Sequence, residues 1–324
     1  MKRILVILLK AAITGGLVVL FLYRVEWQEL RSSLLSVRVG PWAAAVGLFL
    51  LSNLLGAFQW RELLMRQGID LPAKQVVSLY FVGVFFNNFL VSNIGGDVVR
   101  VYDLNRMTGK GLAGFAATFL DRFIGLFVLI CFAVLTYPFT PEAWGAAVWA
   151  PILGLSLGLL GVLCFGFSRR LSGVILTGVE RVLPARVGGF LRAVREAFGL
   201  YRHAYGVLAR VGAFAVGVQL CRIGLFYAAG EALGQEVAFR YYVVFIPLIA
   251  IASAIPISFG GIGVRENMGV LLFGRAGMSA TSAVAVMFLG YVSFIVASLA
   301  GGVLFIVRRV DRTSAPEAGA VADE

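Results

Sequence analysis

Two stretches of this chain place an arginine and a carboxylate shortly after a pair of glycines. The first is N-N-F-L-V-S-N-I-G-G-D-V-V-R at 87–100, and the second is A-I-P-I-S-F-G-G-I-G-V-R-E at 254–266. The planar guanidinium of arginine binds carboxylate and phosphate groups through paired hydrogen bonds. A glycine pair within an apolar run is a place where a helix can unwind. The two stretches therefore predict anion-binding residues beside broken helices.

Both stretches follow the same order of residue types: a serine, a glycine pair, and then an arginine beside a carboxylate. The motif residues are Ser92, Gly95, Gly96, Asp97 and Arg100 in the first stretch, and Pro256, Ser258, Gly260, Gly261, Gly263, Arg265 and Glu266 in the second. Unwound backbone at membrane depth is tolerated only inside protein or beside a water-filled cavity. Two such breaks in corresponding halves of a chain indicate the central site of a transporter. The simpler alternative is that both stretches are ordinary loops between helices.

The composition is that of a polytopic membrane protein. Of the 324 residues, 60% are hydrophobic and 14% are charged, whereas a soluble domain has about 25% charged residues. The net charge of +11 is expected to lie in cytoplasmic loops and against anionic lipid, not against nucleic acid. The three cysteines lie in apolar runs, and His203 is the one histidine. We therefore expect no disulfide, no metal site and no cofactor.

Hydropathy divides the chain into eight hydrophobic segments. Six of them are long enough to span, since about 20 residues cross the hydrocarbon core; they are the ranges 4–23, 41–58, 112–137, 144–167, 211–233 and 281–307. The other two runs, 75–94 and 241–256, end at the glycine breaks, and 262–273 continues the second run. The predicted fold is all-α. Residues 1–310 are expected to form one integral membrane domain, and residues 311–324 a disordered cytosolic tail.

The range 169–210 differs in character from the spans around it. It holds eight arginines and two glutamates, and its apolar residues recur at helical spacing, among them Phe190, Val194 and Phe198. A basic amphipathic helix of this kind lies in the plane of the membrane surface. We expect this segment on the cytosolic side with the three apolar side chains facing lipid. His203 within it is expected to be solvated and not catalytic.

The distribution of basic residues sets a topology. Cytoplasmic loops are enriched in Lys and Arg, so the N-terminus, the range 169–210 and the C-terminal arginines belong on the cytoplasmic side. The link 138–142 has no basic residue and belongs outside. These sides are compatible only if the runs 75–94 and 241–256 each enter and return on one face. We therefore predict two re-entrant hairpins that enter from opposite faces as an inverted pair, with both termini cytoplasmic.

Charged residues also fall inside apolar segments, where charge is costly and marks function or ion pairing. Asp121 and Arg122 lie about midway along one span, and Arg222 lies within another. With the two motifs, the candidate headgroup-binding residues are Asp97, Arg100, Asp121, Arg122, Arg222, Arg265 and Glu266. The arginines would suit a lipid phosphate, and the acids would hold them when no ligand is bound. The alternative is that neighbours in the sequence only form ion pairs that fix helix packing.

These motifs resemble those of the lysylphosphatidylglycerol synthase transmembrane-region family, the flippase-like domain also found in the multiple peptide resistance factor. The resemblance covers nearly the whole chain. The second family motif, P-x-x-x-G-G-x-G-x-R-E, is intact from Pro256 to Glu266. The first, a proline–glycine turn followed by G-E-x-x-R, is N-I-G-G-D-V-V-R here, with Ser92 or Asn93 in place of the proline and Asp97 in place of the glutamate. The family's E-R-x-x-D element is similar to L-D-R-F-I-G-L, which has no second acid.

The resemblance implies lipid handling, namely movement of a phospholipid or a lipid-linked headgroup between the leaflets of a prokaryotic cytoplasmic membrane. The aminoacyl-transferase domain of the synthases is not expected, because the tail after Arg312 is short. Two alternatives stay open: an accessory scaffold for a separate lipid-modifying enzyme, and a lipid-linked glycosyl- or phosphotransferase. The chain has no D-x-D pair and no nucleotide-binding glycine loop, so we expect a transporter with no catalytic residue. Expected partners are a lipid with an anionic headgroup, a second copy of the chain and that separate enzyme.

Overall fold

The computed structural model describes residues 13–20, 22, 23, 25–89, 95–136, 198–254 and 258–314, and isolated residues between 153 and 173. All regular secondary structure in these ranges is helical. The all-α prediction is therefore confirmed for the part of the chain that the structure describes.

Four long apolar helices form the frame of the molecule. They are α3 (Val39–Arg66), α6 (Gly111–Thr136), α10 (Tyr205–Ala232) and α13 (Ala280–Ser314). Each is long and apolar enough to cross a membrane. The 28 residues of α3 or of α10 extend about 42 Å, which exceeds the hydrocarbon thickness of about 30 Å. The protein is thus a polytopic membrane protein, as its composition predicts.

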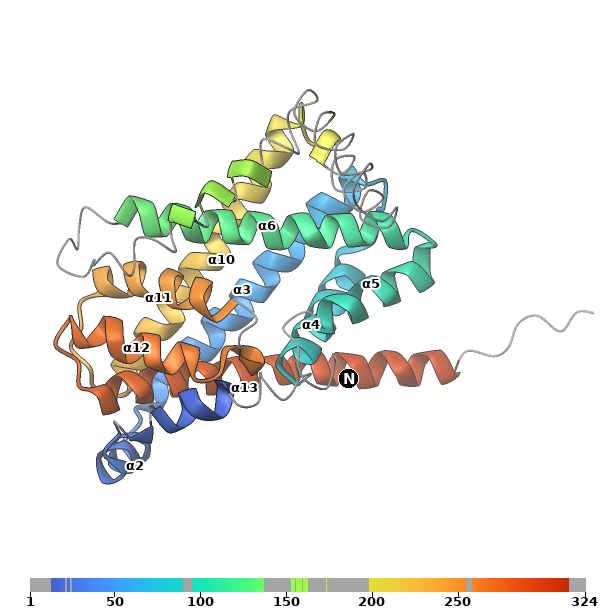
Figure 1. Ribbon diagram of the computed structural model, residues 1–324. Helices are drawn as coiled ribbons and strands as arrows, with labels where there is room; N and C mark the ends of the chain where they lie inside the picture. The colour runs from blue at the N-terminus through green and yellow to red at the C-terminus, as the bar shows by residue number, and fades with distance from the viewer. Residues whose placement is uncertain are drawn as a thin grey trace, which may run out of the picture.

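Helices α3 and α10 lie side by side through the middle of the molecule (Figure 1). Gly217 of α10 lies against Leu55 of α3, and Gly224 lies against Leu48. The residue numbers rise on one helix as they fall on the other, so the pair is antiparallel. Small residues at such an interface let helix backbones approach closely, which replaces the hydrophobic driving force that is absent in lipid.

The first hairpin consists of α4 (Ala73–Phe89) and α5 (Gly95–Thr108). Gly83 of α4 lies against Gly96 of α5, and the backbone N–H of Gly96 donates to Asn87 Oδ1 at 2.8 Å. A Cβ on Gly96 would collide with the carbonyl oxygen of Gly83. The two helices are therefore antiparallel, and glycine is required where their backbones meet.

The second hairpin consists of α11 (Phe239–Ala254) and α12 (Val264–Gly274), with the short helix η3 (Phe259–Gly261) between them. Three glycines of the turn have positive φ: Gly260 at 60°, Gly261 at 75° and Gly263 at 80°. Glycine adopts this left-handed region without a Cβ penalty. The helices then run antiparallel, since the turn residue Gly261 lies against Ser253 while Phe273 reaches back to Tyr242.

The two hairpins lie on opposite sides of α3 in the view of Figure 1. Antiparallel pairing across a glycine break is the arrangement that two re-entrant hairpins require. An ordinary loop between two antiparallel helices would give the same arrangement, so the re-entrant topology stays a prediction.

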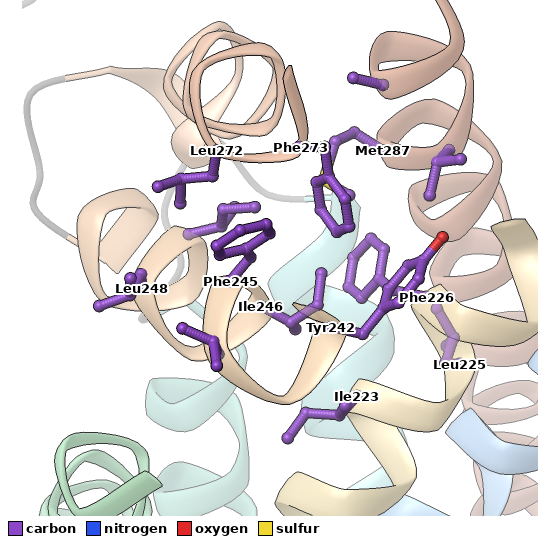
Figure 2. Close-up of a cluster of buried hydrophobic side chains, with 14 of the residues drawn as sticks. Ile223, Leu225, Phe226, Tyr242, Phe245, Ile246, Leu248, Leu272, Phe273 and Met287 are labelled. Carbon is purple, nitrogen blue, oxygen red and sulfur yellow. The ribbon is translucent and has the colours of Figure 1, made fainter. Parts of the chain in front are cut away.

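The largest buried apolar cluster holds the second hairpin against α10 and α13. Figure 2 shows Tyr242 and Phe245 of α11 facing Phe273 of α12, with Phe226 of α10 and Met287 of α13 beside them. The ring centroids of Tyr242 and Phe245 lie 4.8 and 5.2 Å from that of Phe273. A second cluster, centred on Trp60 and Leu63 of α3, packs α3 against α4 and α6.

Several element boundaries differ from the prediction. Helix α3 continues through Arg66 into the expected polar link, because Arg61 and Glu62 find polar partners there: Arg61 Nε donates to the carbonyl of Leu71, and Glu62 pairs with Arg210. For the same reason α10 begins at Tyr205, six residues before the predicted 211. The expected loop after the first span contains helix α2 (Trp27–Leu35).

Other predictions lie outside the described residues. The span 144–167 is described only at isolated positions, and the span 4–23 only from residue 13. Residues 315–324 of the predicted tail lie outside as well. Helix α13 ends at Ser314, and the division into a membrane domain and a tail stays a prediction.

Only the end of the basic segment 169–210 is described, and there one expectation is wrong. Phe198 is 2% exposed and packs edge-on against Phe123 at a centroid distance of 5.4 Å, so it faces protein and not lipid. Tyr201 is also buried, and its hydroxyl donates to the carbonyl of Leu63 at 2.8 Å. Burial raises the pKa of Tyr201 to about 12, so this donor stays protonated at ordinary pH. Phe190 and Val194 lie outside the described residues.

Candidate functional site

The charged residues of the first hairpin meet those of α6 in one buried group. We call Asp97 and Arg100 of α5 together with Asp121 and Arg122 of α6 the arginine–aspartate cluster. Its side chains are 12%, 3%, 7% and 52% exposed, respectively. Three of the four are thus enclosed by protein, and Arg122 alone presents about half of its side chain at the surface.

Two layers of ion pairs hold the cluster together. The Arg122 guanidinium donates from Nε and Nη2 to the two carboxylate oxygens of Asp97, at 2.9 and 3.0 Å. Arg100 lies between two carboxylates, with its Nη2 3.5 Å from Asp97 Oδ1 and 3.4 Å from Asp121 Oδ2. The two-pronged contact fixes Arg122 in orientation, whereas the longer contacts of Arg100 share its charge between α5 and α6.

Uncharged residues of α3 and α4 complete the surroundings of Arg100 and Asp121. The guanidinium carbon of Arg100 lies 4.3 Å from the ring centroid of Trp60 and 4.8 Å from that of Tyr80. A cation over an aromatic face is attracted by the ring quadrupole, most strongly when desolvated. Gln59 Nε2 donates to Asp121 Oδ1 at 2.9 Å. Arg100 is therefore enclosed by two rings and two carboxylates.

The pairing of Asp121 with its neighbour Arg122, one alternative from the sequence, is wrong. Adjacent residues of an α-helix point about 100° apart. Asp121 faces Gln59 of α3 and Arg100, while Arg122 faces Asp97 of α5. The ion pairs therefore join α6 to the first hairpin and do not close within α6.

Arg222 of α10 lies close enough to this cluster to be affected by its charges. Its electrostatic neighbours include Tyr80, Arg122 and Asp121. Its Nε is buried and has no hydrogen-bond partner among the described residues. With Arg222 included, three arginines face two aspartates, so the region carries one excess positive charge.

The charged pair of the second hairpin is closed on itself. Arg265 donates from Nε and Nη2 to Glu266 Oε1 at 3.1 and 2.9 Å, and its guanidinium carbon lies 4.2 Å from the ring centroid of Tyr291. The other carboxylate oxygen of Glu266 accepts from the backbone N–H of Gly263 at 2.6 Å, which caps the start of α12. Within the described ranges, no hydrogen bond or salt bridge joins Arg265 or Glu266 to the arginine–aspartate cluster. The predicted site residues therefore form two separate groups.

The remaining motif residues have structural positions or lie outside the described part. Ser92 and Pro256 lie outside it. Gly95 is the first residue of α5. Ser258 is buried, and its hydroxyl has no hydrogen-bond partner among the described residues. Gly263 lies directly against Leu17, whose carbonyl accepts from Asn267 Nδ2 at 2.9 Å. The helical residues 13–20 therefore pack against the turn of the second hairpin.

Sequence reasoning missed the residues that enclose the arginines: Gln59, Trp60, Tyr80 and Tyr291. A glutamine in an apolar helix is a signal that it could have used, because buried amides need partners. The aromatic residues carry no such signal, since 13% of the chain is aromatic and most rings serve only packing.

The described residues contain no group of three His, Cys, Asp or Glu side chains placed to hold a metal ion. The arrangement in the first hairpin instead offers arginine donors that are held by carboxylates. Its chemical capacity is to bind an anion that can replace a carboxylate as the partner of a guanidinium.

Fold and charges together define a helical polytopic membrane protein with two glycine-broken hairpins and buried arginine sites. The profile of the Lysylphosphatidylglycerol synthase TM region family matches residues 7–301, and the chain belongs to this family. The match includes both hairpins and all seven charged candidates. A similar protein, described as a UPF0104 membrane protein of Methanothermobacter thermautotrophicus, is 27% identical over 256 residues, which are 70% of this chain and 71% of that protein.

Proposed function

We propose that the protein moves a phospholipid or a lipid-linked headgroup between the leaflets of a cytoplasmic membrane, and that the arginine–aspartate cluster holds the anionic headgroup during this movement. The chain performs no covalent chemistry in this proposal. Membership of a family that is named for a membrane region supports it. Buried ionisable groups in membrane segments are costly and are retained where they serve a pathway or a pump.

The observation that carries the proposal is the difference between Arg100 and Arg122. Arg100 is 3% exposed and is held by two carboxylates and two rings, so it is a fixed charge. Arg122 is 52% exposed and has one carboxylate partner, Asp97. A phosphate presents the same paired oxygens to a guanidinium as a carboxylate does. Arg122 can therefore exchange Asp97 for a headgroup phosphate while Arg100 continues to balance the aspartates.

The charge count favours an anionic ligand. Arg100, Arg122 and Arg222 outnumber Asp97 and Asp121 by one. A phosphodiester carries one negative charge, so its arrival neutralises the region and lowers the cost of the buried excess charge. The predicted topology, with both termini cytoplasmic, is part of this proposal. A second copy of the chain and a separate lipid-modifying enzyme remain predicted partners.

The proposal is tested in proteoliposomes that contain a phospholipid with a fluorescent label on its anionic headgroup. A membrane-impermeant quencher reports how fast inner-leaflet label reaches the outside. Arg122→Gln should reduce the protein-dependent rate by about tenfold or more, because a hydrogen bond to a charged group is worth roughly 1.5–3 kcal/mol. The rate of Arg122→Lys should lie between those of the wild type and Arg122→Gln, because lysine keeps the charge but cannot form the paired hydrogen bonds of a guanidinium.

The matched control is Arg38→Gln. Arg38 is a surface arginine, 58% exposed, whose carboxylate partner Glu231 lies 3.9 Å away. Its replacement removes the same charge without touching the cluster, so the rate should stay near that of the wild type. Normal lipid movement by a well-folded Arg122→Gln protein would remove the cluster from the mechanism.

A further inference from the structure

A long apolar cavity of about 560 Å³ lies between α6, α10 and the end of α3. Among its lining residues are Leu63 of α3, Phe123 and Leu135 of α6, Tyr201, and Gly212 of α10. The volume falls within the range of about 300–1,000 Å³ that is usual for small-molecule pockets. Every lining side chain except Tyr201 is apolar or a thiol, and the Tyr201 hydroxyl is already used by Leu63. The cavity therefore suits a hydrocarbon ligand.

This cavity is distinct from the arginine–aspartate cluster. Its α6 residues recur every three or four positions, as in Leu120, Ile124, Phe127 and Cys131, and so share one helix face. At about 100° per residue, Arg122 points to the opposite side of α6. A ligand in the cavity would not contact the half-exposed Arg122.

The cavity runs along the membrane-spanning part of α6 and opens outward. From Leu120 to Leu135 the helix rises about 22 Å, more than the depth of about 15 Å that is one half of the hydrocarbon core. Phe127 is 40% exposed and Leu135 is 70% exposed. These dimensions match an acyl chain that lies lengthwise against the protein.

Two arginines lie near the end of the cavity that Leu63 and Tyr201 line. The Tyr201 hydroxyl bonds the carbonyl of Leu63 there, and exposed Arg66 donates from Nε to the carbonyl of Leu200 at 3.0 Å. Arg202 follows Tyr201 in the chain. In the part of the chain that the structure describes, neither Arg66 nor Arg202 forms a salt bridge with a carboxylate, whereas Arg210 is paired with Glu62 at 2.8 Å. Among the described residues, this end of the cavity therefore has two arginines that no carboxylate pairs with.

We propose that this groove binds one acyl chain of a phospholipid whose anionic headgroup rests on Arg66 and Arg202. The site is a resident-lipid site on the face of α6 opposite Arg122, and it stands independently of the transport proposal. Charge complementarity favours an anionic lipid. A lipid without net charge would fit its acyl chain into the groove equally well, but it would leave Arg66 and Arg202 without a counter-charge.

The test compares binding of phosphatidylglycerol and phosphatidylcholine with identical acyl chains to the delipidated, full-length protein, measured by native mass spectrometry. The groove is narrowed by Gly212→Phe. Apart from the neighbouring backbone of α10, no described atom lies within 4 Å of a Cβ built on Gly212, so the added ring has room to enter the groove. The matched control is Gly47→Phe, because Gly47 of α3 is equally open and does not line the groove.

The wild type should bind phosphatidylglycerol about tenfold more tightly than phosphatidylcholine. Gly212→Phe should weaken binding of both lipids, and Gly47→Phe should change neither. The double change Arg66→Gln with Arg202→Gln should remove the preference for phosphatidylglycerol and leave phosphatidylcholine binding unaltered. In the Arg122→Gln background, which removes the headgroup contact of the cluster, Gly212→Phe should still weaken binding of both lipids, which separates the two proposals.

Two outcomes would overturn the inference. Equal affinity of the wild type for the two lipids would remove the headgroup contact. Unchanged binding by a folded Gly212→Phe protein would show that lipid does not enter the groove, as when another part of the chain fills it.

Discussion

Each hairpin contains a buried arginine, and the two hairpins neutralise its charge in different ways. Each carries an arginine in its second helix, and each arginine stacks on an aromatic ring and contacts a carboxylate. In the first hairpin Arg100 shares its charge with Asp97 and with Asp121 of another helix. In the second, Arg265 pairs with the adjacent Glu266, and Tyr291 of α13 supplies only a ring. The first hairpin is tied to α6 by charge, whereas the second is neutral by itself.

Under the proposed function, this difference gives the first hairpin the binding role and the second hairpin a mechanical one. The Arg265–Glu266 pair has no net charge to attract an anion. Both Glu266 oxygens have partners, one being Arg265 and the other the N–H of Gly263. The open network of the first hairpin includes the half-exposed Arg122 and lies beside the unbalanced charge of Arg222. An anion can therefore alter the first network without breaking the fold of its hairpin. The second hairpin instead depends on its glycine turn and aromatic packing.

The glycines of the two hairpins are also needed for different reasons. Gly96 is required because its backbone touches Gly83 of the facing helix. Gly260 is required because its φ of 60° lies in the left-handed region. Close approach and backbone conformation give different tolerances to substitution, which the substitutions of Gly96 and Gly260 below test.

The largest effect is expected when Asp97 and Arg100 are both replaced by alanine. These two residues look like a local pair in the sequence, but their removal leaves Asp121 and Arg122 without carboxylate or guanidinium partners. Breaking buried ion pairs in this way costs about 3–5 kcal/mol. We expect the double variant to be no more stable than Asp97→Ala or Arg100→Ala alone, as measured by thermal unfolding in detergent. If the double variant were more stable than the single variants, Asp97 and Arg100 would pair only with each other, and the network with α6 would be wrong.

The second hairpin should give the opposite result. Glu266→Ala alone leaves Arg265 buried without an acid and should destabilise by about 3 kcal/mol. Adding Arg265→Ala should recover about half of this loss and leave about 1–2 kcal/mol, because the N–H of Gly263 still lacks its acceptor. The same thermal unfolding measurement checks both numbers.

Lipid movement by this double variant then sharpens the comparison. If the second hairpin is mechanical, the stable Arg265→Ala, Glu266→Ala protein should move lipid at close to the wild-type rate. A stable but inactive double variant would instead return Arg265 to the headgroup site that the sequence suggests.

Asparagine and alanine should distinguish the two glycine roles. Gly96→Ala places a Cβ against the Gly83 carbonyl and should cost about 1–3 kcal/mol through overpacking. Gly260→Asn should cost less than about 1 kcal/mol, since asparagine tolerates the left-handed region. Chemical denaturation of the two variants beside the wild type gives the comparison. Equal losses would mean that close approach, not φ, governs both turns.

A small effect is expected near the C-terminal end of α5. Asp103 of α5 pairs with Arg308 of α13 at 3.0 Å, and the two side chains are 13% and 23% exposed. Asp103→Asn should lower the free energy of unfolding by about 1 kcal/mol, near the upper limit for pairs that solvent reaches. The same change at the exposed pair, Glu231→Gln, should have no measurable effect on thermal unfolding. A loss at Asp103 as large as that in the first prediction would place it within the charge network.

Much of the fold could be predicted from the sequence. Apolar runs longer than a bilayer, such as those within α6 and α13, predict membrane-spanning helices because only internally bonded backbone is stable in lipid. The glycine pairs mark both hairpins, since no other residue combines close approach and positive φ. Charges inside an apolar segment mark Asp121 and Arg122 as candidate site residues, because such charges are costly there, and the first glycine motif marks Asp97 and Arg100.

Only the tertiary structure decided which charges pair. Asp121 and Arg122 are neighbours in the chain, yet the helix turns them toward different partners, and those partners lie 62 residues away at Gln59 and 25 residues away at Asp97. Phe198 repeats at the spacing of a lipid-facing stripe, but Phe123 of α6 covers it. Hydropathy and spacing define which face of one helix is apolar or charged. What that face meets depends on how separate helices pack, and no local pattern encodes this.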